Sequence, residues 1–243
     1  MTTIICIAGF GDNATMFDPL VAAATGSEVQ YHPINLPGFG APALGAHKTS
    51  LEAMASYVMY CAKDLGAEIV LAHSVASIIA TIAAQKPHSP VTSIMSLEGN
   101  LTREDAYFSG TAARYGSADQ FRTAFLNRLE ENAKDDPLIE RYRGVVACAD
   151  GQALWELGCD ADRFSAEHSP GRLLQTVPRA AYFFNPRNIP ESSLLWLESN
   201  ELPKFELPEA SHWASIDKPH LLCRKINEAL EKWKDPGFLI KSS

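Results

Sequence analysis

Apolar residues in this chain fall into short continuous runs, separated by longer stretches with helical spacing. The runs predict β-strands at 2–8, 29–35, 69–71, 91–97, 179–184 and 204–207. Continuous rather than alternating apolar runs are typical of strands buried on both faces. The alternation of such strands with helices therefore predicts a mostly parallel, doubly wound α/β sheet covered by helices on both faces.

Helical spacing and capping residues fill the intervals between these runs. Residues 50–63 have helical spacing and begin with a serine N-cap, and residues 220–232 form an amphipathic helix. The long interval before the last two strands contains only helix starts, at Thr102, Ser117, Asp136 and Ser169. We predict one domain over 1–243, in which residues 100–177 are a helical lid over the carboxyl ends of the strands, where ligands bind in such sheets.

The run at 69–71 leads into the most informative stretch of the chain. Ser74 follows this run, and Ala72 and Ala76 flank it two positions away on each side. An apolar helix then continues to Pro87. A strand that turns sharply into a buried helix, with a hydroxyl at the turn and small neighbours, predicts a nucleophile elbow. The usual elbow has glycine where this chain has alanine, and the local pattern fits a helix-capping serine equally well.

Composition excludes several classes of protein. The chain has 243 residues, of which 46% are hydrophobic, enough for one domain with a sizeable core. Its net charge of −8, without a long basic run, argues against nucleic acid or an anionic membrane as a partner. No apolar run is long enough to span a membrane, and the apolar start at 4–8 is too short for a secretory signal.

The cysteines and the first glycine-rich turn point to no cofactor. The five cysteines are odd in number and scattered, without a Cys-x-x-Cys pair, which is typical of reduced thiols in a cytoplasmic protein. The turn at 9–13 lacks the residues of a phosphate-binding loop. No cluster of metal-ligand residues occurs, so we expect neither a metal nor a cofactor.

Four motifs, in order and at the right spacing, resemble those of the α/β-hydrolases with a single domain and a lid. They are Ala-Gly-Phe-Gly at 8–11, Asn-Leu-Pro-Gly-Phe-Gly at 35–40, His-Ser-Val at 73–75 and Ala-Ser-His-Trp at 210–213. The resemblance covers nearly the whole chain, although the antiparallel N-terminal hairpin common in that family is missing or trimmed. It implies the α/β-hydrolase fold and a catalytic triad.

The resemblance implies that Ser74 is the nucleophile and His212 the base. A serine hydroxyl is a poor nucleophile at neutral pH, so an adjacent imidazole has to remove its proton. Of the seven histidines, His212 follows a short strand at the position that the family uses. His73 is expected to point away from the serine into the sheet.

The triad acid departs from the commonest family pattern. In many members it follows the strand after the lid, but that position holds the uncharged Asn188 here. Some lidded relatives, certain dehalogenases and lactonases among them, resemble this chain in placing a glutamate after the strand before the lid. Glu98 is therefore the expected acid. Glu191 and Asp217 are rivals, and Glu98 alternatively caps a lid helix.

The remaining site residues are inferred from their positions. The backbone N–H groups of Phe10 and Val75 are expected to form the oxyanion hole. The residues expected to bind substrate are Asp12, Asn13, Asn100, Phe108, Trp155 and Trp213. For Asp12 and Asn13 the alternative is capping of the following helix, and for the lid aromatics it is packing. An aromatic lid favours a small, mainly apolar substrate.

These observations predict a cytoplasmic serine hydrolase of the esterase type. It would cleave a carboxylic ester, lactone or thioester of a small molecule through an acyl-enzyme. Two alternatives stay open: a lyase or carbon–carbon bond hydrolase that uses the same triad, and a non-catalytic sensor of a small ligand. We expect no nucleic-acid or membrane partner. The sequence makes no prediction about oligomeric state or about the acyl and alcohol groups.

Overall fold

The computed structural model describes residues 1–45 and 47–235. Six strands form one sheet in the order β2-β1-β5-β6-β7-β8, and every neighbouring pair is parallel. The strands are β1 (Thr2–Ile7), β2 (Val29–Ile34), β5 (Ile69–His73), β6 (Ser93–Leu97), β7 (Arg179–Phe184) and β8 (Lys204–Glu206). The predicted parallel sheet is confirmed, and this six-stranded sheet contains no antiparallel pair.

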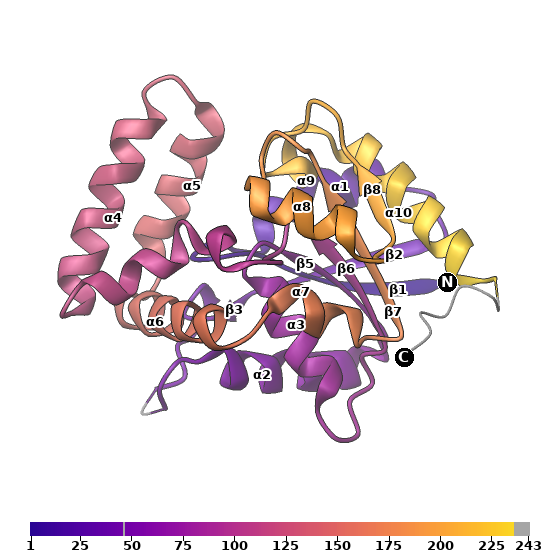
Figure 1. The fold of residues 1–243 in the computed structure, drawn as a ribbon, viewed down its shortest axis with the longest axis horizontal. Helices are drawn as coiled ribbons and strands as arrows, with labels where there is room; N and C mark the ends of the chain where they lie inside the picture. Colours follow the sequence, from indigo (N-terminus) through magenta and orange to yellow (C-terminus); the bar gives the residue numbers. More distant parts are fainter. Residues whose placement is uncertain (46, 236–243) are drawn as a thin grey trace.

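Helices cover both faces of the sheet, which explains the continuous apolar runs. One face carries α1 (Asp18–Ala23), α9 (Ala214–Asp217) and α10 (Pro219–Trp233), and the opposite face carries α2 (Leu51–Leu65) and α3 (Ala76–Gln85) (Figure 1). Every residue of β6 is buried, as is every residue of β5 after the first. Burial of both faces removes the polar alternation that a half-exposed strand would need.

A helical insertion separates β6 from β7, as predicted. It contains η2 (Arg103–Ala106), η3 (Ser109–Arg114), α4 (Ala118–Ala133), α5 (Pro137–Cys148), α6 (Gly151–Glu167) and α7 (Pro170–Gln175). Three of the four predicted starts are capped by their side chains, those at Thr102, Ser117 and Asp136, whereas Ser169 makes no such bond. The hairpin of α4 and α5 stands beyond the carboxyl ends of the strands (Figure 1).

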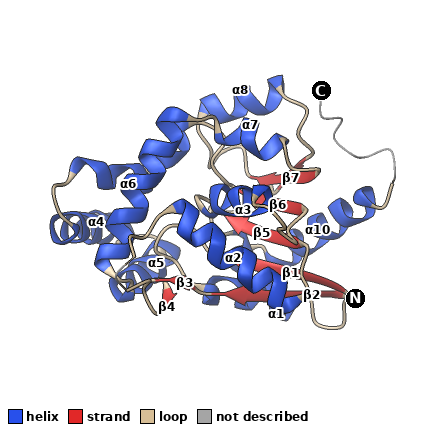
Figure 2. Cartoon of the chain, turned by 90° about the horizontal axis from the view of Figure 1, so that it is seen from below, coloured by secondary structure: helices blue, strands red, loops and turns tan. Residues whose placement is uncertain are grey.

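Helix α6, which the sequence analysis missed, ties this insertion to the sheet layer. Glu156 accepts a hydrogen bond from the Thr49 N–H at 2.7 Å, and Asp160 accepts one from the Leu51 N–H at 2.8 Å. Both N–H groups lie at the start of α2, where a helix leaves its first donors unpaired. Figure 2 shows α4, α5 and α6 gathered at the end of the sheet opposite the N-terminus.

Two smaller features complete the fold. Helix α8 (Glu191–Ser199), also missed by the sequence analysis, connects β7 to β8. The five cysteines are all free thiols. None of the helices in the described part of the chain combines the length and hydrophobicity needed to cross a bilayer.

Candidate active site

Ser74 sits at a sharp turn between β5 and α3. Its φ is +54°, a left-handed conformation that is uncommon for a residue other than glycine. Its N–H donates to the Leu97 carbonyl at 3.0 Å, so the neighbouring strand β6 fixes the turn. Val75 is the N-cap residue of α3, and no side chain caps this helix. The alternative in which Ser74 is a helix-capping serine is therefore wrong.

The loop after β1 passes very close to this turn. An ideal Cβ built on Gly9 would lie 3.0 Å from the Ser74 Cβ and 3.0 Å from the His73 Nδ1. Only glycine allows this approach without displacing the loop. On the other side, Ala72 and Ala76 are completely buried. Their single methyl groups are small enough for strand and helix to pack, which explains why alanine can replace the usual glycine.

Glu98 contacts the ring of His212. Glu98 follows β6 with a φ of +45° and is 4% exposed. Its Oε2 lies 2.8 Å from the His212 Nδ1. Its Oε1 accepts hydrogen bonds from the Asn185 N–H at 2.9 Å and from the Asn188 Nδ2 at 2.8 Å. The carboxylate is thus fully bonded within the site, and the alternative in which it caps a helix of the insertion is excluded.

The rival acids bind elsewhere. Asp217 accepts a hydrogen bond from the Ser211 N–H at 2.7 Å. Glu191 begins α8, and within residues 1–45 and 47–235 neither carboxylate contacts the His212 ring. Asn188, at the position where the resemblance would have placed the acid, donates its amide hydrogen to Glu98.

Ser74 and His212 line the same cavity. Because Glu98 occupies Nδ1, the Nε2 of His212 is the ring nitrogen left for the serine or the substrate. Among the described residues, no hydrogen bond joins the Ser74 hydroxyl to this ring. Such contacts are often long in the absence of substrate and shorten when it binds. The arrangement can therefore supply a hydroxyl, an imidazole and a carboxylate in sequence.

His73 does not point away from the site, contrary to the prediction. It lines the cavity, and its Nε2 donates to the His212 carbonyl oxygen at 2.9 Å. Burial lowers its pKa well below the ordinary value, and nearby His212 and Arg141 add to this shift. A neutral ring that donates from Nε2 has only an acceptor at Nδ1, which has no hydrogen-bond partner among the described residues.

The two expected oxyanion donors lie beside the serine. Phe10 is 4% exposed and lines the cavity, and Val75 directly follows Ser74. Within the described residues, neither backbone N–H has a hydrogen-bond acceptor. The carbonyl oxygen of Phe10 accepts a hydrogen bond of 2.5 Å from the hydroxyl of Tyr142, which holds this part of the loop. Two unpaired N–H groups at a reacting hydroxyl are what an oxyanion hole requires.

The cavity encloses about 350 Å³ of empty space, its mouth included. It is lined by Gly9, Phe10, Asp12, His73, Ser74, Asp105, Tyr107, Phe108, Ser109, Tyr142, His212 and Trp213. Asp12, Phe108 and Trp213 therefore lie where the sequence analysis expected substrate contacts. Aromatic rings and polar groups contribute to the lining in similar measure.

The other three residues expected to bind substrate lie outside this lining. Asn13 caps η1 (Ala14–Phe17), its side chain accepting a hydrogen bond from the Thr15 N–H, as the alternative interpretation held. Asn100 is 2% exposed and buried away from the cavity. The indole of Trp155 donates to the Tyr115 carbonyl and packs within the insertion. None of these three residues lines the cavity that contains Ser74, and substrate contact at them stays a prediction.

The structure adds residues that the sequence analysis did not assign to the site. Tyr107 and Ser109 come from the short helices after β6, and Tyr142 comes from α5. Burial raises the pKa of the Tyr107 hydroxyl, and Glu98 and Asp105 add to the rise. A tyrosine at helical spacing is usually a packing residue, so the sequence carried no signal that separated these residues from the core.

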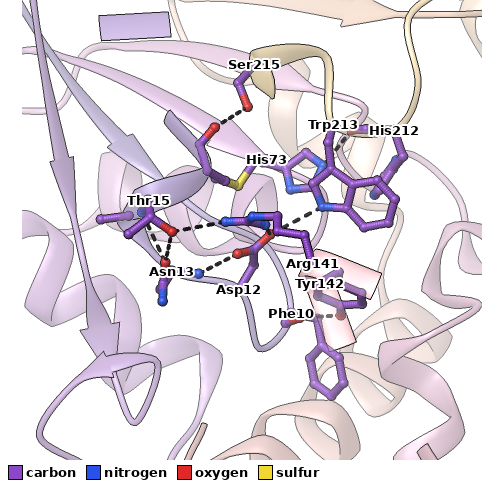
Figure 3. A network of polar contacts seen from close by, with 12 residues as sticks. Phe10, Asp12, Asn13, Thr15, His73, Arg141, Tyr142, His212, Trp213 and Ser215 are labelled. Carbon is purple, nitrogen blue, oxygen red and sulfur yellow. Dashed lines mark hydrogen bonds and ion pairs between the residues drawn. The ribbon is translucent and has the colours of Figure 1, made fainter. Parts of the chain in front are cut away.

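Asp12 forms the centre of a polar network at the edge of the cavity (Figure 3). Its Oδ2 lies 2.7 Å from the Arg141 Nη1 and 3.2 Å from the Trp213 Nε1. Its Oδ1 accepts a hydrogen bond from the Asn13 N–H at 2.8 Å. The Nη2 of Arg141 also donates to the Thr15 hydroxyl at 3.2 Å. The network joins α5 to the loop after β1 and to the loop that carries His212.

The described residues include no group of three or more histidine, cysteine, aspartate or glutamate side chains able to hold a metal ion.

Comparison with known proteins gives similarity in structure only. No protein-family model matches the chain, and no curated protein matches its sequence. An esterase from Thermogutta terrifontis is 17% identical with a TM-score of 0.72, over 96% of this chain and 90% of the esterase. An enol-lactonase from Burkholderia xenovorans is 14% identical with a TM-score of 0.68, over 95% of this chain and 91% of the lactonase.

A third similar structure has a different reaction. It is a variant of an enzyme that recognises the Pseudomonas quinolone signal and cleaves its ring, 14% identical with a TM-score of 0.70. The match covers 95% of this chain and 91% of that enzyme. These structures share the parallel sheet and its flanking helices with this chain, and the fold expected from the sequence is confirmed.

Proposed function

We propose that this chain, which has the α/β-hydrolase fold, is a serine hydrolase. It cleaves an ester-like bond of a small molecule, a carboxylic ester, lactone or thioester, with Ser74, His212 and Glu98. One observation carries the proposal: the 2.8 Å contact between the His212 Nδ1 and the buried carboxylate of Glu98, in a cavity shared with Ser74. A serine on a strained turn becomes an activated nucleophile when it lies beside a histidine that a carboxylate orients.

In the first half of the reaction, the Ser74 oxygen attacks the carbonyl carbon of the substrate. The hydroxyl proton passes to the His212 Nε2, and Glu98 stabilises the resulting imidazolium through Nδ1–H. The N–H groups of Phe10 and Val75 bind the negative oxygen of the tetrahedral intermediate. When the intermediate collapses, the bond to the alcohol or thiol breaks, and His212 gives its proton to that leaving group.

In the second half, water hydrolyses the acyl-enzyme. His212 removes a proton from the water, whose oxygen attacks the acyl carbon on Ser74. The same two N–H groups bind the second oxyanion, and the serine regains its proton as the acid leaves. The ring therefore alternates between base and acid, and Glu98 keeps it in one orientation throughout.

The helical insertion, predicted as a lid over residues 100–177, supports a small substrate. Phe108 and Tyr142 come from the insertion and line the same cavity as Ser74. Most of the 350 Å³ of empty space belongs to the open mouth of the cavity, so the enclosed part beside Ser74 is narrow. The aromatic rings favour an apolar acyl group, whereas Asp12 and Ser109 provide polar surface for one directional contact.

A fluorophosphonate probe tests the proposal. Its phosphorus accepts the serine oxygen, fluoride leaves, and the hydroxyl proton passes to the histidine. We expect labelling of the native protein at Ser74, located by peptide mass spectrometry, and none in Ser74→Ala. Ser109→Ala removes the other serine of the cavity and should leave the label in place. No adduct on the native protein, or an adduct that persists in Ser74→Ala, would contradict the role of Ser74.

A second candidate function is ring or carbon–carbon bond cleavage, or a lyase reaction, on the same residues. The similarity in structure to the ring-cleaving enzyme favours it. In this reaction His212 takes a proton from the substrate itself, and Ser74 only assists. Turnover that survives in Ser74→Ala would support this candidate. Ligand-induced thermal stabilisation without turnover would instead indicate a sensor.

A further inference from the structure

Asp12 is a buried carboxylate next to the expected oxyanion hole. It follows Phe10 by two residues, lines the same cavity as Ser74 and is 2% exposed. Its N–H donates to the Gly9 carbonyl at 3.2 Å, which closes the turn that carries the Phe10 N–H. A negative charge at this position opposes the negative charge that develops on the substrate oxygen, and low polarity strengthens the effect. A hydrolase needs this charge to be compensated.

Arg141 supplies the compensation from the helical insertion. Its Nη1 lies 2.7 Å from the Asp12 Oδ2, and its side chain is 25% exposed. The same carboxylate oxygen accepts the indole N–H of Trp213, the residue after His212 (Figure 3). One carboxylate thus joins helix α5 to the oxyanion loop and to the loop of the catalytic histidine.

The residue after Arg141 makes a second link between the same two segments. Tyr142 donates its hydroxyl hydrogen to the Phe10 carbonyl at 2.5 Å, and its ring packs on Trp213 with 5.3 Å between the ring centroids. Helix α5 therefore holds the oxyanion loop at two points, Phe10 and Asp12. Small displacements of such a loop reduce rates strongly, because the donors must meet the oxyanion at hydrogen-bond distance.

We infer that Arg141 is a positioning residue for the hydrolysis of the substrate. It cancels the charge of Asp12 beside the oxyanion and fixes the loop that carries the Phe10 N–H. The insertion then completes the catalytic site, besides covering it, and the site is fully assembled only when α5 is docked. This inference rests on the proposed function, because it assigns a role in the same reaction.

The experiment compares two arginines of the same helix. Arg141→Gln removes the guanidinium that reaches Asp12, whereas Arg143→Gln removes one whose ion-pair partner is Glu140 on the same helix. We expect Arg141→Gln to lower kcat for a chromogenic acetate ester, and the rate of labelling at Ser74, roughly tenfold to hundredfold with little change in KM. Arg143→Gln should leave both rates unchanged. Arg141→Lys keeps the positive charge, so kcat and the labelling rate should fall less than in Arg141→Gln.

A double variant separates charge from simple loss of packing. In Arg141→Gln the Asp12 carboxylate is left without its counter-charge, and Asp12→Asn in the same chain removes that charge. We expect the double variant to react faster than Arg141→Gln alone. Thermal unfolding of each variant confirms that it is folded.

Three outcomes can be told apart. Equal rates for Arg141→Gln and Arg143→Gln would overturn the inference, as would a double variant no faster than Arg141→Gln. A native protein that neither takes the label nor turns over the ester would instead overturn the proposed function, and the inference with it. A lowered reaction rate of the Arg141→Gln variant, with partial recovery of that rate in the double variant, would support the inference.

Discussion

His73 holds the main chain of His212: its Nε2 donates to the His212 carbonyl oxygen at 2.9 Å, and the two ring centroids lie 4.5 Å apart. The residue before the proposed nucleophile therefore fixes the loop that carries the expected base. This bond needs a proton on Nε2, and burial together with the neighbouring His212 and Arg141 keeps the pKa of His73 well below its ordinary value. The ring is a neutral structural link between two parts of the site.

The lowered pKa of His73 predicts acid sensitivity of the fold. Below a pH of about 6.5 the unfolded chain binds a proton at this residue and the folded chain does not. The free energy of unfolding should therefore fall with decreasing pH, by up to about 1.4 kcal/mol per pH unit for this one proton. Urea unfolding across this range measures the slope. His73→Gln should flatten it, whereas the same change at the exposed His88 should not; equal slopes for all three proteins would contradict the prediction.

The role proposed for Glu98 as the acid of the triad can be tested against its neighbour Asn188. Glu98→Gln should lower kcat by roughly 10³- to 10⁴-fold, because an amide stabilises neither the reactive tautomer nor the imidazolium. Asn188→Ala should cost only about tenfold, since it removes one hydrogen bond to the carboxylate. Sequence reasoning gave Asn188 no part in the reaction, and the structure changes this expectation. Steady-state kinetics decide, and a larger effect of Asn188→Ala would contradict the assignment of Glu98.

Gly9 offers a test of the close approach between the oxyanion loop and the elbow. Gly9→Ala places a methyl group 3.0 Å from the Ser74 Cβ, so the loop has to move. We expect a loss of roughly a hundredfold in kcat, with the Phe10 N–H displaced. Gly144→Ala is the control, because its Cβ meets nothing within 4 Å on the exposed side of α5. It should keep full activity and stabilise the fold by about 0.5–1 kcal/mol. Similar kinetics for both variants would count against the tight packing at Gly9.

Two tryptophans make the same kind of hydrogen bond at different places. The Trp213 indole N–H donates to Asp12 at 3.2 Å, and the Trp155 indole N–H donates to the Tyr115 carbonyl at 3.2 Å. Only the first lines the cavity. Trp213→Phe should lower kcat/KM about tenfold or more, whereas Trp155→Phe should leave it within about twofold. Matched kinetics and unfolding curves for the two variants provide the measurement, and a larger kinetic effect at Trp155 would show that the cavity extends further.

The position of a residue was predictable from the sequence wherever that position depends on local structure. Ser74 and Glu98 directly follow buried strands, and Phe10 lies three residues after the end of β1. Parallel strands bring their carboxyl ends to one edge of the sheet. Their meeting with His212 follows from this topology. The missing glycines at the elbow did not mislead, because Ala72 and Ala76 need only be small.

The contribution of the insertion was not predictable in the same way. Tyr142 and Trp155 both lie on helices with mixed apolar spacing, yet only Tyr142 reaches the cavity. Which helix face turns toward the strand ends depends on how α4, α5 and α6 pack together, and spacing does not encode that packing. Arg141 was missed for the same reason, because its partner Asp12 is distant in the sequence. For Asn13 the sequence could not separate capping from ligand contact, because both use the same residue type, and the structure shows the capping bond.

Ser74 and Glu98 both have left-handed backbones, at the ends of two adjacent strands. Each such conformation costs about 1–2 kcal/mol for a residue with a side chain, and the surrounding strands have to supply that energy. Selection of variants for thermal stability alone should favour glycine at both positions. Glycine would relieve the backbone strain, but it would remove the two side chains that the proposed reaction needs. Libraries built to make this protein more thermostable should therefore leave these two codons unrandomised.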